Sequence, residues 1–438
     1  MAEIHPFRGV RYNPSLVQDI SAVICPPYDI ITPQARQELY RRSEYNFVRL
    51  ESAWELPQDS ATDNKYIRSA ATLKQWLERG ILKPDEKPAI YLHDQYFTYQ
   101  GNEHRRRGII ACVRLEEWDR MVIRPHEGTL AQPKDDRISL LWALQANTSP
   151  ILVLYEDQGY QVSSLLSVQE QSEPAISATG VKGERHYIWA ITDPEVTAQI
   201  CRSLAHQPLY IADGHHRYES ALTYQRERRA CSPSAGRVEP FDFVMMTLVD
   251  FADPGLVILP PHRLVRGLSR ATLSELAVKL KSFFQIEELP LGTPGVWQQV
   301  DAFLKQGEAS QDRLALFGLA PERLFLLRLE DLAATKEMMP YFHSELYKRL
   351  AVSIVDHVIL ERLLGLGGGG HEAMLGYTYE RQAAVDKVLD QEYQLAILIS
   401  PVRAEVVRSI ADAGDRMPRK STYFYPKLPS GLVFYRLV

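Results

Sequence analysis

The sequence lacks the cysteine pattern of a disulfide-bonded or zinc-binding protein. Its four cysteines, Cys25, Cys112, Cys201 and Cys231, are scattered and form no Cys-x-x-Cys pair. This spacing excludes a disulfide framework and a zinc ribbon, and it fits a reducing compartment. The first residues lack a signal-peptide pattern, and no apolar run approaches the length of a membrane span. We therefore expect a cytoplasmic protein without a membrane partner.

An excess of positive charge is also missing. Lys and Arg number 50 against 55 for Asp and Glu, which gives a net charge of −5 and argues against a nucleic-acid partner. We interpret the short basic runs Arg105–Arg107 and Arg226–Arg229 as a solvated hairpin tip and a solvated helix face. The length of 438 residues and the 45% hydrophobic content predict a globular chain of two or three domains.

Helical and strand patterns alternate along the chain, which predicts a mixed α/β fold. We expect helices over 62–79, 138–146, 193–205, 271–283 and 344–364, and strands over 89–99, 108–118, 151–155, 187–191 and 243–249. Asp193 and Pro194 have the residue types that begin a helix. The glycine run 365–370 is interpreted as a flexible connection. We divide the chain into an N-terminal region, 1–264, and a C-terminal α/β region, 265–438.

The most informative segment is Asp213-Gly214-His215-His216-Arg217, which follows the apolar run 209–212 and precedes a helical pattern. The first turn of a helix presents N–H groups and the positive end of the macrodipole to anions. Gly214 permits close approach of a ligand, and an arginine can bind an oxyanion through two N–H groups. The segment predicts a phosphate-binding strand–turn–helix, although an ordinary Asp-Gly turn with a polar cap is the alternative.

A second polar cluster is Pro125-His126-Glu127-Gly128-Thr129, followed by Asp135 and Asp136. Glu127 has the chemistry of a general base, with His126 as its neighbour, and either aspartate could hold Mg²⁺. On the residues alone, a polar loop with internal ion pairs explains this segment equally well.

Two other segments favour structural roles. The segment 414–421 has the spacing of a nucleotide-binding P-loop, but Arg419 occupies the position of the second glycine and Pro418 removes an N–H donor. Lys420 and Lys427 could still contact an anion from a loop. His262, within Pro261-His-Arg263, is interpreted as a structural histidine that could line the same cleft.

Five motifs together resemble a bacterial and archaeal family of proteins of unknown function, the "one-zero-one-five" family. They are Cys25-Pro-Pro-Tyr-Asp29, His126-Glu-Gly-Thr129, Ala212-Asp-Gly-His-His-Arg217, Pro261-His-Arg263 and Met417-Pro-Arg-Lys-Ser-Thr-Tyr-Phe-Tyr-Pro-Lys427. The family label itself carries little biochemistry.

A more distant resemblance, over residues 119–224, is to the ParB/sulfiredoxin superfamily. It implies a nucleotide-binding core at about 108–250, in which Gly214 to Arg217 hold phosphates. A long insertion over 156–208 interrupts this core. His215 stands where sulfiredoxins have cysteine, so thiol chemistry is not implied. The Pro125-His126-Glu127 loop is similar to that of free-serine kinases, in which the glutamate is the base.

These resemblances imply a phosphotransferase that uses ATP or ADP, or CTP, with Mg²⁺ and phosphorylates free serine or a similar hydroxyl-bearing metabolite. Gly214, His215, His216 and Arg217 would bind the nucleotide, and Glu127, His126 and Asp213 would serve catalysis. Two alternatives stay open: a nucleotide-binding regulatory module without turnover, and a phosphate-ester hydrolase. The sequence leaves the metal ligands and the oligomeric state open.

Overall fold

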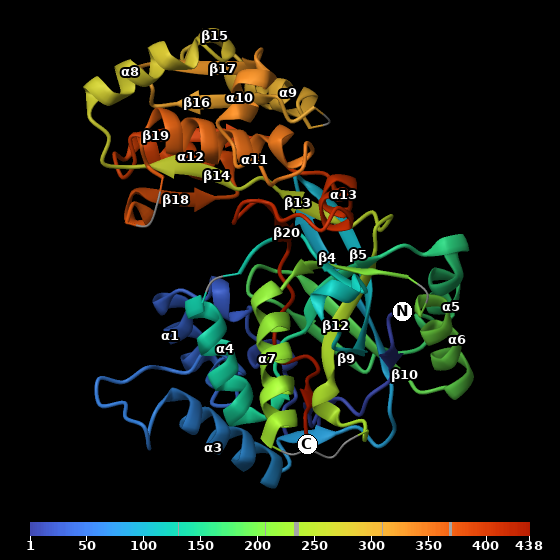
Figure 1. Ribbon diagram of the computed structural model, residues 1–438. Helices are drawn as coiled ribbons and strands as arrows, with labels where there is room; N and C mark the ends of the chain where they lie inside the picture. The colour runs from blue at the N-terminus through green and yellow to red at the C-terminus, as the bar shows by residue number, and fades with distance from the viewer. Residues whose placement is uncertain (130, 206, 232–235, 309, 368–369) are drawn as a thin grey trace. The chain divides into compact units, whose positions relative to one another are not determined.

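The computed structural model describes residues 1–129, 131–205, 207–231, 236–308, 310–367 and 370–438, and it confirms the mixed α/β class (Figure 1). The chain forms two compact units. Unit 1 consists of residues 1–125, 129–257 and 426–438, and unit 2 of residues 126–128 and 258–425. Strand β13 (Val257–Leu259) contains one of the points at which the chain passes between units.

Unit 1 is built on one large mixed sheet. The sheet has the strand order β6-β11-β8-β12-β5-β4-β10-β9, with β1 beside β5. Its strands are β1 (Ile4–His5), β4 (Ile90–Tyr99), β5 (Asn102–Arg114), β6 (Ile123–Pro125), β8 (Ile151–Tyr155), β9 (Ile176–Thr179), β10 (Arg185–Ile191), β11 (Leu209–Asp213) and β12 (Phe243–Asp250). Two small pairs join β2 (Val10–Tyr12) to β3 (Leu82–Pro84) and β7 (Ala146–Asn147) to β21 (Tyr435–Arg436).

Both faces of this sheet are apolar, because side chains alternate along each strand. In β5, Ile109, Ala111 and Val113 belong to one core cluster, and Ile110 and Cys112 to the other. The second cluster includes residues of α1 (Pro33–Arg42), α2 (Val48–Glu51), α3 (Lys65–Glu78) and α4 (Ala131–Leu144). The first includes residues of α5 (Gln161–Gln169), α6 (Pro194–Leu204) and α7 (His215–Cys231). The sheet is therefore buried on both sides.

Unit 2 is built on an antiparallel sheet with the order β15-β17-β16-β19-β14-β18. Its strands are β14 (His262–Val265), β15 (Phe284–Pro290), β16 (Arg313–Phe317), β17 (Arg323–Leu329), β18 (Leu375–Thr378) and β19 (Leu395–Ile399), and β20 (Tyr423–Tyr425) follows later. Its helices are α8 (Arg270–Leu280), α9 (Val296–Gln306), α10 (Leu332–Glu337), α11 (Ala351–Ser353), α12 (Arg381–Leu389) and α13 (Ala404–Asp412). Apolar residues of α9 and α12 pack on one face of the sheet.

Most predicted elements are present, including β8 at its predicted bounds and the Asp193 cap on α6. The predicted helix 344–364 is instead a 3-10 turn (Tyr347–Arg349), the short α11, and a π-helical segment (Ile354–Leu363). In an α-helix each N–H bonds the fourth preceding carbonyl, and in a π-helix it bonds the fifth. A repeat of apolar residues does not distinguish these two patterns. Within the predicted glycine connection, residues 368–369 lie outside the described part of the chain.

The two units are not consecutive segments of the chain. We expected the second region to begin at residue 265, but the chain enters unit 2 at residue 258 and returns to unit 1 at residue 426. The return is fixed by backbone pairing: the Val10 N–H donates to the Phe434 carbonyl at 2.9 Å, and β21 pairs with β7. Such pairing across the length of the chain has no local sequence signal.

Candidate functional site

The phosphate-binding segment predicted at residues 213–217 has the expected strand–turn–helix structure. Strand β11 ends at Asp213, Gly214 adopts a φ of +98°, and α7 begins at His215. An L side chain is strained at this φ, and a Cβ on Gly214 would also lie 2.9 Å from the Arg217 Nε. Glycine is therefore required here because the Arg217 guanidinium lies against the turn. His215 is buried and His216 is half-buried in the first turn of α7.

The Asp213 carboxylate bonds two cations, one through each oxygen. Lys427 Nζ forms an ion pair with Oδ1, and Arg217 Nη2 lies 2.7 Å from Oδ2. Burial by itself raises the pKa of Asp213, but the Lys427 ammonium and the Arg217 guanidinium outweigh it and hold the pKa below its usual range. Asp213 is thus a carboxylate at neutral pH, and one negative charge is set against two positive charges.

Lys427 was missed as a partner of Asp213, because 213 residues separate it from Gly214 and no local pattern links them. Its backbone is held from the sheet: the Gln95 side chain donates to the Lys427 carbonyl at 3.3 Å, and Arg106 Nη2 donates to the Pro426 carbonyl at 2.6 Å. Arg106 is 2% exposed, so the interpretation of Arg105–Arg107 as a solvated hairpin tip is wrong for this residue. Arg107, beside it, forms an ion pair with Asp94 at 2.6 Å.

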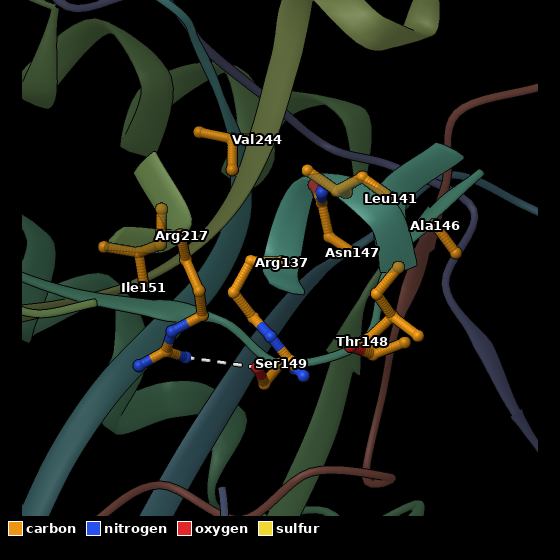
Figure 2. A pocket seen from close by; sticks show the side chains of 10 residues that line it. Arg137, Leu141, Ala146, Asn147, Thr148, Ser149, Ile151, Arg217 and Val244 are labelled. Atoms are coloured by element: carbon orange, nitrogen blue, oxygen red, sulfur yellow. Dashed lines mark hydrogen bonds between the residues drawn. The ribbon is translucent and has the colours of Figure 1, made fainter. Parts of the chain in front are cut away.

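Arg217 also joins α7 to the segment before β8. Its Nη1 donates to the Ser149 hydroxyl at 3.2 Å (Figure 2) and also to the Pro150 carbonyl. Within the described part of the chain, these bonds and the one to Asp213 use three of the five guanidinium N–H groups. Two N–H groups therefore remain for a ligand.

A second buried arginine, Arg137 of α4, lies at the same segment. It donates to the Glu51 carboxylate at 3.3 Å and to Asp136 at 2.9 Å, and its guanidinium stacks 3.8 Å from the centre of the Tyr28 ring. Burial raises the pKa of Tyr28 to about 12, against the opposite effect of Arg137 and Arg217. Tyr28, from the Cys-Pro-Pro-Tyr-Asp motif, thus belongs to the same network in unit 1.

Asp136 is a poor candidate for the predicted Mg²⁺ ligand. Its carboxylate bonds Arg137, Lys65 and the Tyr66 hydroxyl, and these bonds lower its pKa to about 2 although burial opposes them. The two cations neutralise the charge that a metal would need. Among the residues described, no group of three His, Cys, Asp or Glu side chains is arranged to hold a metal ion.

His126 and Glu127 belong to unit 2, where the Pro-His-Glu loop meets the segment after Lys420. Glu127 Oε1 accepts from the backbone N–H groups of Ser421 at 3.1 Å and Thr422 at 3.0 Å, and from the Thr422 hydroxyl at 3.1 Å. The buried His126 ring bonds the same hydroxyl at 2.9 Å through Nε2. Both predicted catalytic residues are therefore fixed by Thr422.

His262 and Arg263 have structural roles in unit 2. His262 accepts from the Ile399 N–H at 3.2 Å, and burial lowers its pKa to about 3, so it is neutral. Arg263, 0% exposed at its side chain, pairs with Asp356 at 3.0 Å and donates to the Lys420 carbonyl at 3.0 Å. Lys420, at a φ of +59°, is held in place from both sides of its peptide unit.

Comparison with known proteins places the chain in a family. The model of the "Protein of unknown function (DUF1015)" family matches residues 4–353, so the chain belongs to this family. No curated protein matches the chain. In the described residues, no helix combines the length and apolar character that crossing a membrane requires.

Several solved structures are similar at low identity. A free serine kinase in complex with AMP is 13% identical, with a TM-score of 0.36, over 72% of this chain and 86% of that chain. A conserved hypothetical protein from Pyrococcus furiosus is 12% identical, with a TM-score of 0.36, over 74% and 93%. SbnI from Staphylococcus aureus, truncated at its C-terminus, is 11% identical, with a TM-score of 0.34, over 73% and 85%. These scores are too low to carry an argument about activity.

Proposed function

We propose that this member of the family is a nucleotide-dependent phosphotransferase that phosphorylates the hydroxyl of free serine or a similar small metabolite. The observation that carries the proposal is the pairing of Asp213 with both Lys427 and Arg217 beside Gly214, at the start of α7. One carboxylate between two cations leaves net positive charge, and the helix terminus adds to it. Such an arrangement suits the phosphates of ATP, ADP or CTP.

The residues of unit 1 would bind the phosphates as a positioned cradle. Gly214, His215 and His216 form the turn and the first helical residues, and Arg217 keeps two N–H groups for phosphate oxygens. Asp213 would hold Lys427 and Arg217 in place. Phosphoryl transfer depends mainly on positioning and on neutralising charge, which is what fixed cations supply. Mg²⁺ would enter with the nucleotide and neutralise its phosphates, since Asp136 is already paired.

Glu127 would take the proton of the acceptor hydroxyl. As it does, the acceptor oxygen bonds to the terminal phosphorus, the bridging P–O bond breaks, and its electrons leave with the shortened nucleotide. Three donors on Glu127 Oε1 restrict the carboxylate to one orientation, as a base that must meet a hydroxyl requires. His126 would support that orientation through Thr422.

The test is incubation of the full chain with Mg²⁺, one nucleotide at a time, and a panel of hydroxyl amino acids. Phosphorus NMR should show a new phosphate monoester and equal consumption of nucleotide. Arg217→Lys, which keeps the charge but loses the planar fork, should abolish turnover. Arg228→Lys, at the other end of α7, is the matched control and should be unchanged.

Two other functions would give different results. A regulatory module would bind nucleotide and raise the melting temperature without forming a monoester. A phosphate-ester hydrolase would release inorganic phosphate from phosphoserine in the absence of nucleotide. Either result would replace the kinase proposal.

A further inference from the structure

A small pocket lies in unit 1 beside the residues proposed to bind phosphate. It is lined by Arg137, Leu140, Leu141, Ala146, Asn147, Thr148, Ser149, Ile151, Arg217 and Val244 (Figure 2). Its volume of about 30 Å³ holds about two ordered waters or one small polar group. A nucleotide base or a ribose is too large for it.

The lining of the pocket has the chemistry of an anion site. It contains two guanidinium groups, those of Arg137 and Arg217, and the carboxylates that pair with them, those of Glu51, Asp136 and Asp213, are not part of the lining. In Figure 2, both guanidinium groups lie at the level of Ser149, and Val244 and Leu141 lie on the other side. The polar half would receive a charged group and the apolar half would exclude water, which strengthens charged hydrogen bonds.

In the polar half of the pocket, Ser149 is held by hydrogen bonds to two other side chains, whereas the hydroxyl of Thr148 makes none with the residues described. The Ser149 hydroxyl donates to Glu51 at 3.3 Å and accepts from Arg217 at 3.2 Å, so its orientation is fixed. Thr148 is 7% exposed, and its hydroxyl makes no hydrogen bond with the described part of the chain. Its hydroxyl is therefore available to donate a hydrogen bond to a ligand in the pocket.

Arg217 connects this pocket with the start of α7. It lines the pocket and also pairs with Asp213. Its Nη1 bonds Ser149 and Pro150 at the pocket and its Nη2 bonds Asp213 at the turn, so one guanidinium group spans the two places.

From this arrangement we infer that the pocket between Arg137 and Arg217 binds the carboxylate of the acceptor, so that the acceptor is a small hydroxy-carboxylate or amino acid. The identification of this ligand as the phosphate acceptor rests on the proposed function, but the carboxylate site is defined by its own residues. Thr148 would donate to the carboxylate, and Arg137 and Arg217 would contribute their charges. The volume of about 30 Å³ would admit the carboxylate and leave the hydroxyl outside.

The binding test uses two pairs of probes that differ only in the charged group, glycolate against glycolamide and L-serine against L-serinamide. Saturation-transfer NMR on the full chain should detect the carboxylates, with the amides bound at least about tenfold more weakly. Thr148→Val, which keeps the shape and removes the hydroxyl, should weaken glycolate binding about tenfold. Nucleotide affinity should be unchanged in this variant.

The matched control is Thr247→Val. Thr247 of β12 is 1% exposed, its hydroxyl also lacks a partner in the described residues, and it does not line the pocket. Its substitution should leave glycolate binding unchanged. If Thr148→Val binds glycolate as wild type does, or if no carboxylate binds, the inference is wrong.

Failure of this inference and failure of the proposed function are distinguishable. Equal phosphorylation of L-serine and L-serinamide would overturn the carboxylate site and keep the phosphotransferase. Glycolate binding that depends on Thr148, without transfer to any acceptor, would keep the site and overturn the phosphotransferase.

Discussion

Asp213 in unit 1 and Glu127 in unit 2 are both partly buried carboxylates, but the partners described for them differ in charge. Asp213 bonds an ammonium and a guanidinium, whereas Glu127 accepts from two backbone N–H groups and a hydroxyl. A carboxylate between two cations has no tendency to take a proton, and its use is to place those cations. The donors described for Glu127 orient its carboxylate. In the proposed function, Asp213 would position the two cations and Glu127 would take the proton.

The largest effect should come from Glu127→Gln. The amide oxygen can accept the same three hydrogen bonds, so the loop should keep its structure, but the base is lost. We expect turnover to fall by roughly 10²- to 10⁴-fold, measured by phosphorus NMR. Nucleotide affinity, measured by calorimetry, should change less than about twofold. A variant that retains turnover would remove Glu127 from the mechanism.

The next largest effect should distinguish Lys427 from Lys420, two lysines of the same motif, by their contributions to stability and nucleotide binding. Lys427→Met breaks a buried ion pair and should lower the free energy of unfolding by roughly 3 kcal/mol and remove nucleotide binding. Lys420→Met, at an exposed side chain of unit 2, should change stability by less than about 0.5 kcal/mol. Urea denaturation and calorimetry measure both quantities. Unchanged nucleotide binding in Lys427→Met would contradict its role at the phosphates.

A smaller effect is expected for Gly214→Ala. The added Cβ meets the Arg217 guanidinium and adopts an unfavourable φ, which should cost roughly 2 kcal/mol and weaken nucleotide binding. Gly80→Ala is the control, because Gly80 also has a positive φ, +70°, but no atom lies within 4 Å of its Cβ. If Gly80→Ala also lost nucleotide affinity, backbone strain at a positive φ, and not contact with Arg217, would explain the effect of Gly214→Ala.

The smallest expected effect is a difference between the two units in how their stability falls as the pH is lowered. Burial holds the pKa of His186 at about 3 and that of His93 below its usual range in unit 1, and His262 is held at about 3 in unit 2. These histidines take up protons only on unfolding, so stability falls as pH drops below about 6.5. Between pH 7 and pH 6, each should cost roughly 0.7 kcal/mol.

Hydrogen exchange measured by mass spectrometry reports each unit separately and can test this difference. Unit 1, with two such histidines, should lose protection faster than unit 2. His262→Gln should remove most of the pH dependence of unit 2 in this range. Equal pH dependence in both units would mean that the His93–His186 pair is not kept neutral.

Local structure was predictable because it depends on neighbouring residues. The bounds of β8, the Asp193 cap and the Asp-Gly turn follow from apolar runs and capping residues. The pairing of Lys427 with Asp213 and the burial of Arg106 depend on strands that meet from distant parts of the chain. No sequence periodicity encodes such contacts. The sequence therefore predicted that the basic run at Arg106 is exposed to solvent and that Lys427 lies in a loop.

The route of the chain also sets an order of assembly. Residues 426–438, which carry Lys427, belong to unit 1 but are synthesised after the whole of residues 258–425. On the ribosome, unit 1 therefore waits for its last strand and its ammonium while unit 2 is being made. Until then Asp213 lacks one of its two cations, and nascent unit 1 cannot form the anion site. Under the proposed function, nucleotide binding would therefore require residues 426–438 to have joined unit 1.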